Sequence, residues 1–224
     1  MTPRLLDLFC CQGGASMGYH RAGFEVVGVD KDPQPRYPFE FVQADALEYL
    51  AEHGHEFDAI HASPPCQAHT KAQRIMGNEH EDFIPRTRLM LYGLNWHRSI
   101  NLGLPPVPWV IENVPDSPLL NPVVLCGAMF GIGTYRHRLF ESNRELKAPE
   151  HPEHIARHAK MGRPPKDGEF MHIVGNFSGV EQARQIMGMP WANRDGLREA
   201  IPSVYTEWIG TQLLAYVTKR GVPA

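Results

Sequence analysis

The chain has 224 residues, and its 22 lysines and arginines nearly balance its 25 aspartates and glutamates, giving a formal net charge of −3. This length allows one well-buried core and a small second lobe. The charge balance disfavours a surface that coats nucleic acid broadly, although it is compatible with a local basic face. The sequence lacks an apolar run of the roughly 18 residues that a membrane span needs, and its start lacks a secretory signal pattern.

Strand-like and helix-like segments alternate through the first half of the chain. The spacing of apolar residues, glycines and prolines predicts helices over 15–24, 46–53 and part of 81–100, the first closed by Gly23 and the last starting after Pro85. Strands are predicted at 4–9, 25–30, 39–45, 57–62 and 105–114. This alternation predicts an α/β fold with a doubly wound, mostly parallel, Rossmann-like sheet and helices on both faces.

The pattern changes after residue 142. Residues 143–177 are polar, carry several prolines and histidines, and offer little that could build a core, so we expect a small lobe or insertion there. Residues 178–224 return to helical patterns, with Ser178 as the expected N-cap of the first helix. Three parts are therefore predicted: a main domain over 1–142, a lobe over 143–177, and C-terminal helices over 178–224.

Chemically distinctive residues follow the predicted strands. Ligands of open parallel sheets bind at the carboxyl ends of the strands. Those ends carry a glycine turn after Phe9, then Asp30, Asp45, the turn 64–67 and Glu112. The acid 20 residues or so after the glycine turn suits the hydroxyls of a ribose, but a solvated or helix-capping aspartate fits equally well. Asp45 has the same two interpretations, a contact to an amino group or an N-cap. Together these residues suggest a nucleoside-bearing cofactor without a pyrophosphate site.

Cys66 stands in "SPPCQ", where the prolines fix the backbone at the end of a strand. A cysteine in a protein is usually a buried apolar residue. A rigid turn at the ligand end of a sheet, with a carboxyl group at the next strand end, also suits a nucleophile paired with an acid.

Six segments together resemble the DNA (cytosine-5)-methyltransferase family: "DLFCCQGGASMGYHRAGF", "VVGVD", "ASPPCQ", "VIENV", "YRHRLF" and "IPSVYTEWIG". The resemblance covers nearly the whole chain except about 143–177. It implies that Cys66 adds to C6 of a flipped cytosine, that Glu112 holds N3 and the exocyclic amine, and that Arg138, with Arg136 beside it, contacts the base. The short chain suggests a compact phage or bacterial member of this family, such as a methyltransferase of a restriction-modification system.

The resemblance also implies a cofactor and a nucleic-acid partner. S-adenosylmethionine, whose product is S-adenosylhomocysteine, is expected to contact Phe9, Cys10, Cys11, Gly13, Gly14, Asp30, Lys31, Asp45, Ala46 and Pro64. Double-stranded DNA is expected to contact Gln67, Lys71, Arg74, Arg157, Lys160 and Arg163. We expect a monomer in the cytoplasm of a bacterial or phage-infected cell, away from membranes, with any cognate nuclease on another chain.

Three positions depart from the family pattern. Cys11 replaces a glycine, Glu199 falls in the place of an asparagine, and Thr134 in that of a glutamine. Alternatives to DNA methylation are therefore the same chemistry on RNA, transfer of a modified one-carbon group, or a degenerate member that binds DNA without turnover. Because Cys66 and Glu112 are present, we favour the active DNA enzyme.

The sequence contains four cysteines and a histidine-rich stretch, "EHPEHIARH". Four cysteines in a chain of this length do not indicate a disulfide framework, which favours a reducing compartment. They also lack C-x-x-C spacing, which disfavours a zinc site. His154 and His158 are four residues apart, as two ligands on a helix could be. Because the glutamate of an H-E-x-x-H pattern is missing, we predict no metal.

Overall fold

A seven-stranded sheet forms the centre of the protein in the computed structural model, which describes residues 2–69, 80–160 and 162–219. The strand order is β3-β2-β1-β4-β5-β7-β6, and β7 runs antiparallel to both of its neighbours while β1 to β5 are parallel. The predicted doubly wound, mostly parallel sheet is confirmed. The strands are β1 (Arg4–Leu8), β2 (Glu25–Asp30), β3 (Glu40–Gln43), β4 (Ala59–Ala62), β5 (Trp109–Asn113), β6 (Val123–Leu125) and β7 (Arg138–Ser142).

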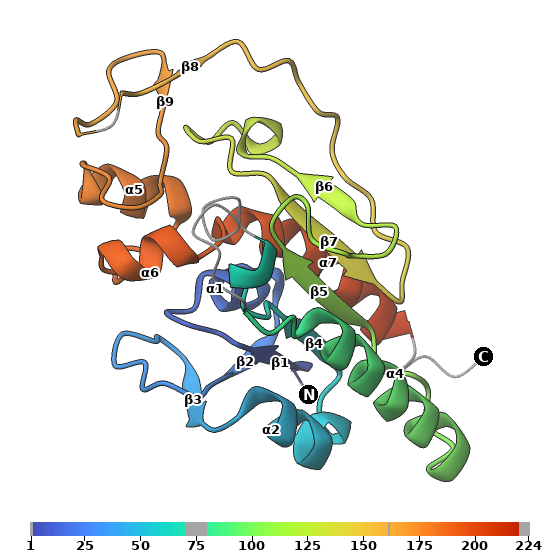
Figure 1. Cartoon of the computed structure of the whole chain (residues 1–224). Helices are drawn as coiled ribbons and strands as arrows, with labels where there is room; N and C mark the ends of the chain where they lie inside the picture. The colour runs from blue at the N-terminus through green and yellow to red at the C-terminus, as the bar shows by residue number, and fades with distance from the viewer. Residues whose placement is uncertain (1, 70–79, 161, 220–224) are drawn as a thin grey trace.

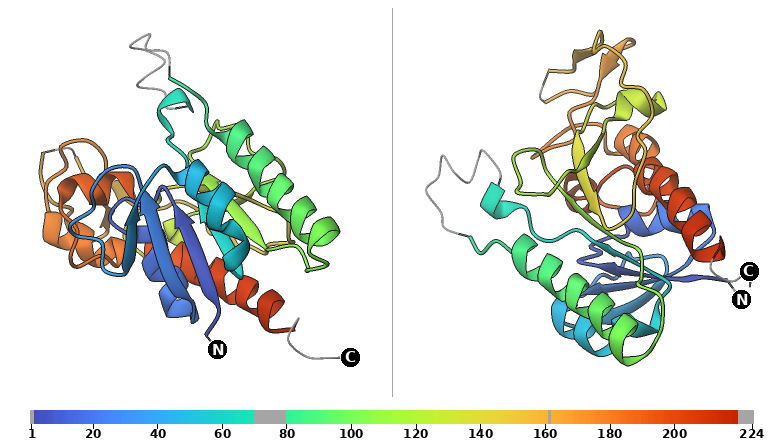
Figure 2. Two further views of the ribbon diagram at one scale, coloured as in Figure 1. Left: turned by 90° about the horizontal axis from the view of Figure 1, so that it is seen from below. Right: turned by 90° about the vertical axis from the view of Figure 1, so that its right-hand side faces the viewer.

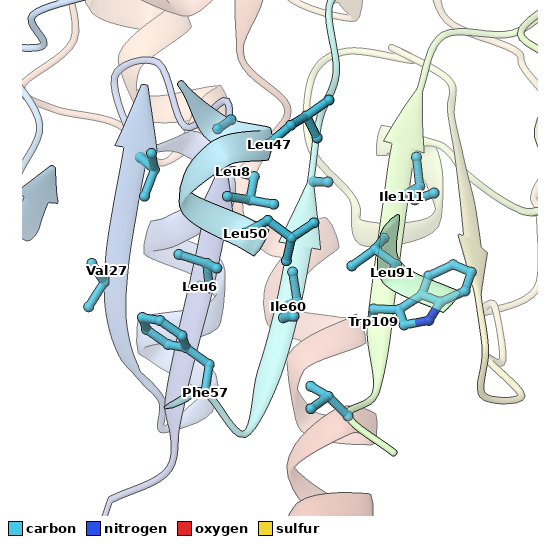
Figure 3. Packing of buried hydrophobic residues seen from close by; sticks show 14 of the residues in the cluster. Leu6, Leu8, Val27, Leu47, Leu50, Phe57, Ile60, Leu91, Trp109 and Ile111 are labelled. Carbon is cyan, nitrogen blue, oxygen red and sulfur yellow. The ribbon is translucent and has the colours of Figure 1, made fainter. Parts of the chain in front are cut away.

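Two helices cover each face of the sheet (Figures 1 and 2). On one face lie α2 (Ala46–His53) and α4 (Ile84–Asn101), and on the other lie α1 (Gly14–Ala22) and α7 (Ser203–Lys219). Strand side chains alternate between the two cores. Leu6 and Ile60 face α2 and α4 (Figure 3), whereas Leu5 and Ala59 belong to the core that includes α1 and α7. Each fully buried leucine or isoleucine contributes about 1.5–3 kcal/mol of transfer free energy.

The last helix packs tightly against the first. A Cβ at Gly18 would lie 2.1 Å from the Ser203 carbonyl oxygen and the Thr206 Oγ1, so only glycine permits this approach. The Thr206 hydroxyl donates to the carbonyl of Ala15 at 2.9 Å. Any side chain at Gly18 should therefore push α7 away from α1. This contact brings the residues before α7 next to the glycine turn that precedes α1.

A third, smaller core lies outside the sheet. It joins Met171, Ile173 and Phe177 with residues of two short helices, α5 (Val180–Met187) and α6 (Arg194–Glu199). This core therefore combines residues from both sides of the domain boundary predicted at 177. Two two-residue strands, β8 (Arg157–His158) and β9 (Glu169–Phe170), pair in parallel beside it (Figure 1).

Several elements differ from the sequence expectations. The N-cap of α5 is Gly179, at φ 88°, so the prediction of Ser178 as cap is wrong. α4 begins at Ile84 and takes Pro85 into its first turn, where a missing N–H costs nothing, so it starts before and not after that proline. The expectation missed β6 to β9, α6 and three single-turn 3₁₀ helices, η1 (Gly54–Glu56), η2 (Gln67–His69) and η3 (Gly127–Phe130).

Over residues 2–69, 80–160 and 162–219, none of the helices combines the length and the apolar character needed to cross a membrane.

Candidate active site

The Pro-Pro-Cys turn connects the end of β4 to η2. The Asn113 side-chain amide, at the end of the neighbouring β5, donates to the Pro64 carbonyl at 2.9 Å. The His69 amide donates to the Cys66 carbonyl at 3.0 Å, and the Ser63 amide to the Leu8 carbonyl at 3.2 Å. Since two neighbouring strands and η2 hold the backbone, the Cys66 thiol has a fixed position at the carboxyl end of the sheet.

A buried ion pair lies beside this turn. The Arg138 Nε is 3.0 Å from the Glu112 Oε1, with side-chain exposures of 15% and 8%. Glu112 is on β5 and Arg138 begins β7, its antiparallel neighbour, so pairing of the two strands brings these side chains together. The pair therefore rests on sheet pairing and not on a loop.

Cys66, Glu112 and Arg138 are electrostatically coupled. Burial raises the pKa of the Cys66 thiol, the positive charge of Arg138 partly offsets this shift, and the Glu112 carboxylate adds to it. Burial also raises the pKa of Glu112, against the opposing effects of Arg138 and of a hydrogen bond from Ser63. Protonation of Glu112 therefore favours the thiolate of Cys66, because it removes a nearby negative charge.

A chain of buried polar residues reaches Glu112 from the opposite direction. The Tyr19 hydroxyl is 2.9 Å from the His61 Nδ1, and the His61 Nε2 is 2.8 Å from the Ser63 hydroxyl, which bonds to Glu112. Burial lowers the pKa of His61 to about 3, so its ring is neutral and can accept at one nitrogen while donating at the other. The sequence alone assigned no role to Ser63 or His61. The histidine in the otherwise apolar strand "AIHA" is the one signal that could have pointed to a buried polar contact there.

Arg136 makes its contacts away from this centre. Its guanidinium donates to the carbonyls of Ala200, Ile173 and Arg198 at 2.8, 2.7 and 2.6 Å. These carbonyls belong to the third core and its α6 end, so Arg136 joins the sheet to that region. Burial is the largest cause of the lowering of its pKa to about 9.

The loop after β1 has an unusual backbone. Phe9 and Cys11 have positive φ values of 60° and 45°, and Gly13 has φ 83°. L-residues avoid this left-handed region, whereas glycine adopts it readily. A glycine at position 11, as in the family that the sequence resembles, would therefore adopt this backbone with less strain than Cys11 does. The Asp30 carboxylate holds the loop by accepting from the Cys11 amide at 3.0 Å. Its other oxygen accepts from the Asp32 amide at 3.1 Å.

The residues before α7 close over this loop. The Gln12 side chain donates to Asn193 at 2.9 Å, and the Trp191 indole donates to the Gln12 carbonyl at 2.7 Å. A Cβ at Gly14 would lie 2.8 Å from Ala200, so the chain passes directly over the glycine turn. The negative charge of Glu199 is close enough to raise the pKa of Cys11, after burial and Asp30.

Asp45 performs the capping role. Its Oδ1 accepts from the Leu47 and Glu48 amides at 2.9 and 3.0 Å, so it is the N-cap of α2, and Ala46 begins the helix. Lys31 is exposed, and its carbonyl accepts from the Gln43 side chain at 3.1 Å. Asp45 and Lys31 lie at the carboxyl ends of adjacent parallel strands, β3 and β2.

The expected DNA contacts fall into different environments. Gln67 is exposed and begins η2, directly after Cys66, while Lys71 and Arg74 lie outside the described residues. Arg157 and Lys160 are exposed in the lobe. Arg163 instead forms a two-point ion pair with Glu169, both contacts at 2.7 Å, which lowers the pKa of that carboxyl to about 2. This pairing connects Arg163 to β9.

Known proteins are similar to part of this chain in sequence and to nearly all of it in fold. Two bacterial relatives are similar over part of the chain: the type II methyltransferase M.FnuDI of Fusobacterium nucleatum, 30% identical over 33% of this chain and 24% of its own, and M.AquIA of Picosynechococcus, 31% identical over 51% and 49%. The chain thus spans between a quarter and a half of the length of these relatives. No protein-family model matches it.

Solved structures match over nearly the full length. One is described as a DNA modification methyltransferase encoded within an E. coli prophage, with a TM-score of 0.62, 15% identity, and coverage of 97% of this chain and 100% of that one. The Dnmt2 methyltransferase of S. pombe also has a TM-score of 0.62, with 12% identity and coverage of 96% and 99%. The fold of this chain is therefore the Rossmann-like fold of methyltransferases.

Proposed function

We propose that this chain is an S-adenosylmethionine-dependent DNA (cytosine-5)-methyltransferase with Cys66 as its nucleophile. The observation that carries the proposal is the position of Cys66, fixed at the carboxyl end of β4 within electrostatic reach of the buried Glu112–Arg138 pair. The similarity to two type II methyltransferases supports the reaction class, and the fold is compatible with it.

The chemistry requires these three groups. C5 of cytosine is a poor nucleophile until a thiolate adds to C6. In the proposal the Cys66 sulfur forms the bond to C6, the ring electrons move towards C5 and N3, and N3 takes a proton from Glu112. The raised pKa of Glu112 keeps the proton available for this transfer. After the methyl group has joined C5, loss of the C5 proton expels the thiolate and restores the aromatic ring.

Arg138 and Ser63 keep Glu112 in place during this reaction. The arginine lies against one carboxylate oxygen and favours the thiolate of Cys66, and we assign it the contact to the O2 of the base. Arg136 is proposed as a positioning residue, since its guanidinium bonds to three backbone carbonyls. The target carbon is inaccessible in a duplex, so the base must be flipped out to reach Cys66.

The loop after β1 fits the cofactor. S-adenosylmethionine supplies an electrophilic methyl group. Two observations of this chain support the fit: the backbone at 9, 11 and 13 is left-handed, as in tight turns that approach a ligand closely, and the Asp30 carboxylate anchors that loop at the end of β2. We assign Phe9, Cys10, Cys11, Gly13, Gly14, Asp30, Lys31, Asp45, Ala46 and Pro64 to this site.

The proposed substrate is double-stranded DNA in a bacterial or phage-infected cell, with Gln67, Arg157 and Lys160 among the contacts. To test the activity, the chain is expressed in a host lacking cytosine methylation, and the DNA is sequenced for 5-methylcytosine. We expect 5-methylcytosine in a defined context with the wild type, and none with Cys66→Ser. If the DNA stays unmodified and the RNA carries 5-methylcytosine, the substrate is RNA and not DNA. Neither modification, with the cofactor bound, would refute the proposed activity.

A further inference from the structure

Four side chains of types that can bind a metal converge at a place distinct from Cys66. Cys126, His137, His151 and His154 each offer one ligand atom, and these atoms all lie within 4.8 Å of one another. They come from separate segments: Cys126 precedes η3, His137 precedes β7, and the other two lie in the extended chain that leads to β8. Figure 1 shows that this chain crosses over the β6 side of the sheet on its way to the lobe.

Two distances between ligand atoms are close to the edge lengths of a tetrahedral zinc site, and all four atoms lie within 4.8 Å of one another. The Cys126 Sγ is 3.2 Å from the His154 Nε2, and the His137 Nε2 is 3.3 Å from the His151 Nε2. Zinc bonds of about 2.0–2.1 Å to nitrogen and 2.3 Å to sulfur place neighbouring ligand atoms roughly 3.3–3.6 Å apart at tetrahedral angles. The four atoms therefore need to move little to enclose one ion.

The protonation of the ligands suits a metal. The His151 Nδ1 is 2.9 Å from the Pro152 carbonyl, which can only accept, so Nδ1 carries the hydrogen and Nε2 has its lone pair free to bind. Metal ligation needs such an unprotonated ring nitrogen.

Supporting contacts surround the four ligands. The Tyr135 ring stacks on His154 with centroids 3.7 Å apart, and its hydroxyl donates to the Ala156 carbonyl at 2.8 Å. Such outer contacts orient ligands in built metal sites.

We propose that Cys126, His137, His151 and His154 bind one Zn²⁺ in a closed, structural site. Thiolate and imidazole ligands in a tetrahedron select zinc, and four protein ligands leave no open position for a substrate. This inference departs from the prediction of a metal-free chain. His154 and His158 do not share a helix, because residues 151–156 are not helical and His158 lies in β8.

A metal ion at this site would connect the lobe to the central sheet. His137 stands between Arg136, which holds the third core, and Arg138, which pairs with Glu112. Binding one ion to His137, Cys126 and the segment 151–154 therefore ties the start of the lobe to the strand that carries Arg138. The inference concerns a different site from the proposed reaction centre, so it stands or fails independently of that proposal.

The first test measures bound metal. The full chain is expressed with zinc chloride, purified without chelator, and analysed for metal content. We expect about one zinc per wild-type chain, and a loss of at least about ten-fold in zinc affinity for His151→Ala and His154→Ala. His158→Ala is the matched control, since it is an exposed histidine of the same region that contacts Tyr135 but lies outside the cluster. Absence of stoichiometric zinc, or equal loss in the control, would overturn the proposal.

A second test identifies the ligands without reference to activity. After dialysis against a chelator, cobalt chloride should give the visible bands of tetrahedral cobalt and a thiolate-to-cobalt band in the near ultraviolet. Cys126→Ser should lose the near-ultraviolet band, whereas Cys66→Ser should keep it. Removing the metal should also speed protease cleavage within 143–160, and zinc chloride should reverse this change. Octahedral cobalt spectra, or cleavage that is insensitive to zinc, would contradict a closed site.

Discussion

The proposed reaction centre and the small lobe are held in place in different ways. Glu112 and Arg138 lie on paired strands of a seven-stranded sheet, and Cys66 follows a strand whose four residues are all buried. β8 and β9, in contrast, pair over two residues each, and the lobe depends on the Arg163–Glu169 pair and on contacts with α5 and α6. Rigid strands thus carry the groups that need a fixed geometry, while a lightly held segment carries exposed basic side chains.

The largest effect is expected from Cys66→Ser. Serine has a hydroxyl in place of the thiol and so cannot supply the thiolate nucleophile. Methyl transfer should therefore fall by about 10³-fold or more. Cofactor binding should change by less than about three-fold, because all but one of the residues assigned to the cofactor lie at the ends of other strands and none is Cys66. Single-turnover methylation and equilibrium binding measure the two quantities. Near-normal turnover in the serine variant would refute the assignment of Cys66 as nucleophile.

Arg138→Lys should have the next largest effect. A lysine keeps the charge but cannot match the planar guanidinium contact to Glu112, so turnover should fall by about 10²-fold. Because Arg138 lowers the pKa of both Cys66 and Glu112, any weakening of its charge raises both values. The rising limb of the pH–rate profile, which reports thiolate formation, should therefore move to higher pH. A lower turnover with an unchanged profile would argue against this coupling.

Asp30→Ala tests the other half of the strand-end site. Loss of the carboxylate removes the proposed ribose contact and releases the Cys11 amide, so cofactor affinity should fall by about ten-fold. Turnover at saturating cofactor should change by less than about three-fold, since a contact made equally in ground and transition states alters binding alone. Asp30→Asn is the control that keeps an acceptor for the Cys11 amide. Unchanged affinity with lost turnover would remove Asp30 from the cofactor site.

The smallest effects are expected in the lobe. Replacing Arg157 and Lys160 together by alanine should weaken DNA binding by a few-fold to about ten-fold and make the salt slope shallower by about two. Arg163→Ala should instead loosen β9, because its guanidinium is committed to Glu169. Binding titrations at several salt concentrations separate the two outcomes. An unchanged slope in the double variant would take Arg157 and Lys160 out of the DNA interface.

The size of the lobe also limits target choice. About 35 residues can place only a few side chains on base edges, and each good bidentate contact contributes roughly 1–3 kcal/mol of discrimination. We therefore expect modification of a dinucleotide to tetranucleotide context. Sequencing of modified DNA measures this directly, and strict modification at six or more base pairs by the protein alone would contradict it.

Strongly patterned elements could be predicted from the sequence. β2 matches its predicted bounds, and α1 ends at Ala22 with Gly23 as its C-cap, whose φ of 110° explains why glycine is needed there. Asp30 and Glu112 could be placed at strand ends because parallel strands finish on the same edge. β6, of three residues, and β7, of five, were missed because residues 126–137 separate them, so no hairpin turn marks the pair.

Features that depend on distant residues could not be predicted in this way. Arg136 looks like a partner of Arg138 in the sequence, yet its guanidinium bonds to carbonyls about 37 to 64 residues away. The cluster of Cys126 and three histidines has no C-x-x-C or H-E-x-x-H spacing, because its ligands come from segments that only the fold brings together. Local spacing rules detect ligands on one helix or one turn and miss such sites.

Covalent trapping on 5-fluorocytosine DNA tests the central claim most directly. Fluorine at C5 prevents the loss of the C5 proton, so the bond between sulfur and C6 cannot break after methyl transfer. With S-adenosylmethionine present, the wild type should form a complex that survives denaturation, and peptide mass analysis should place the nucleotide on Cys66. The Cys66→Ser variant should form none. An adduct on another cysteine, or methylation of ordinary cytosine without any trapped complex, would contradict the account.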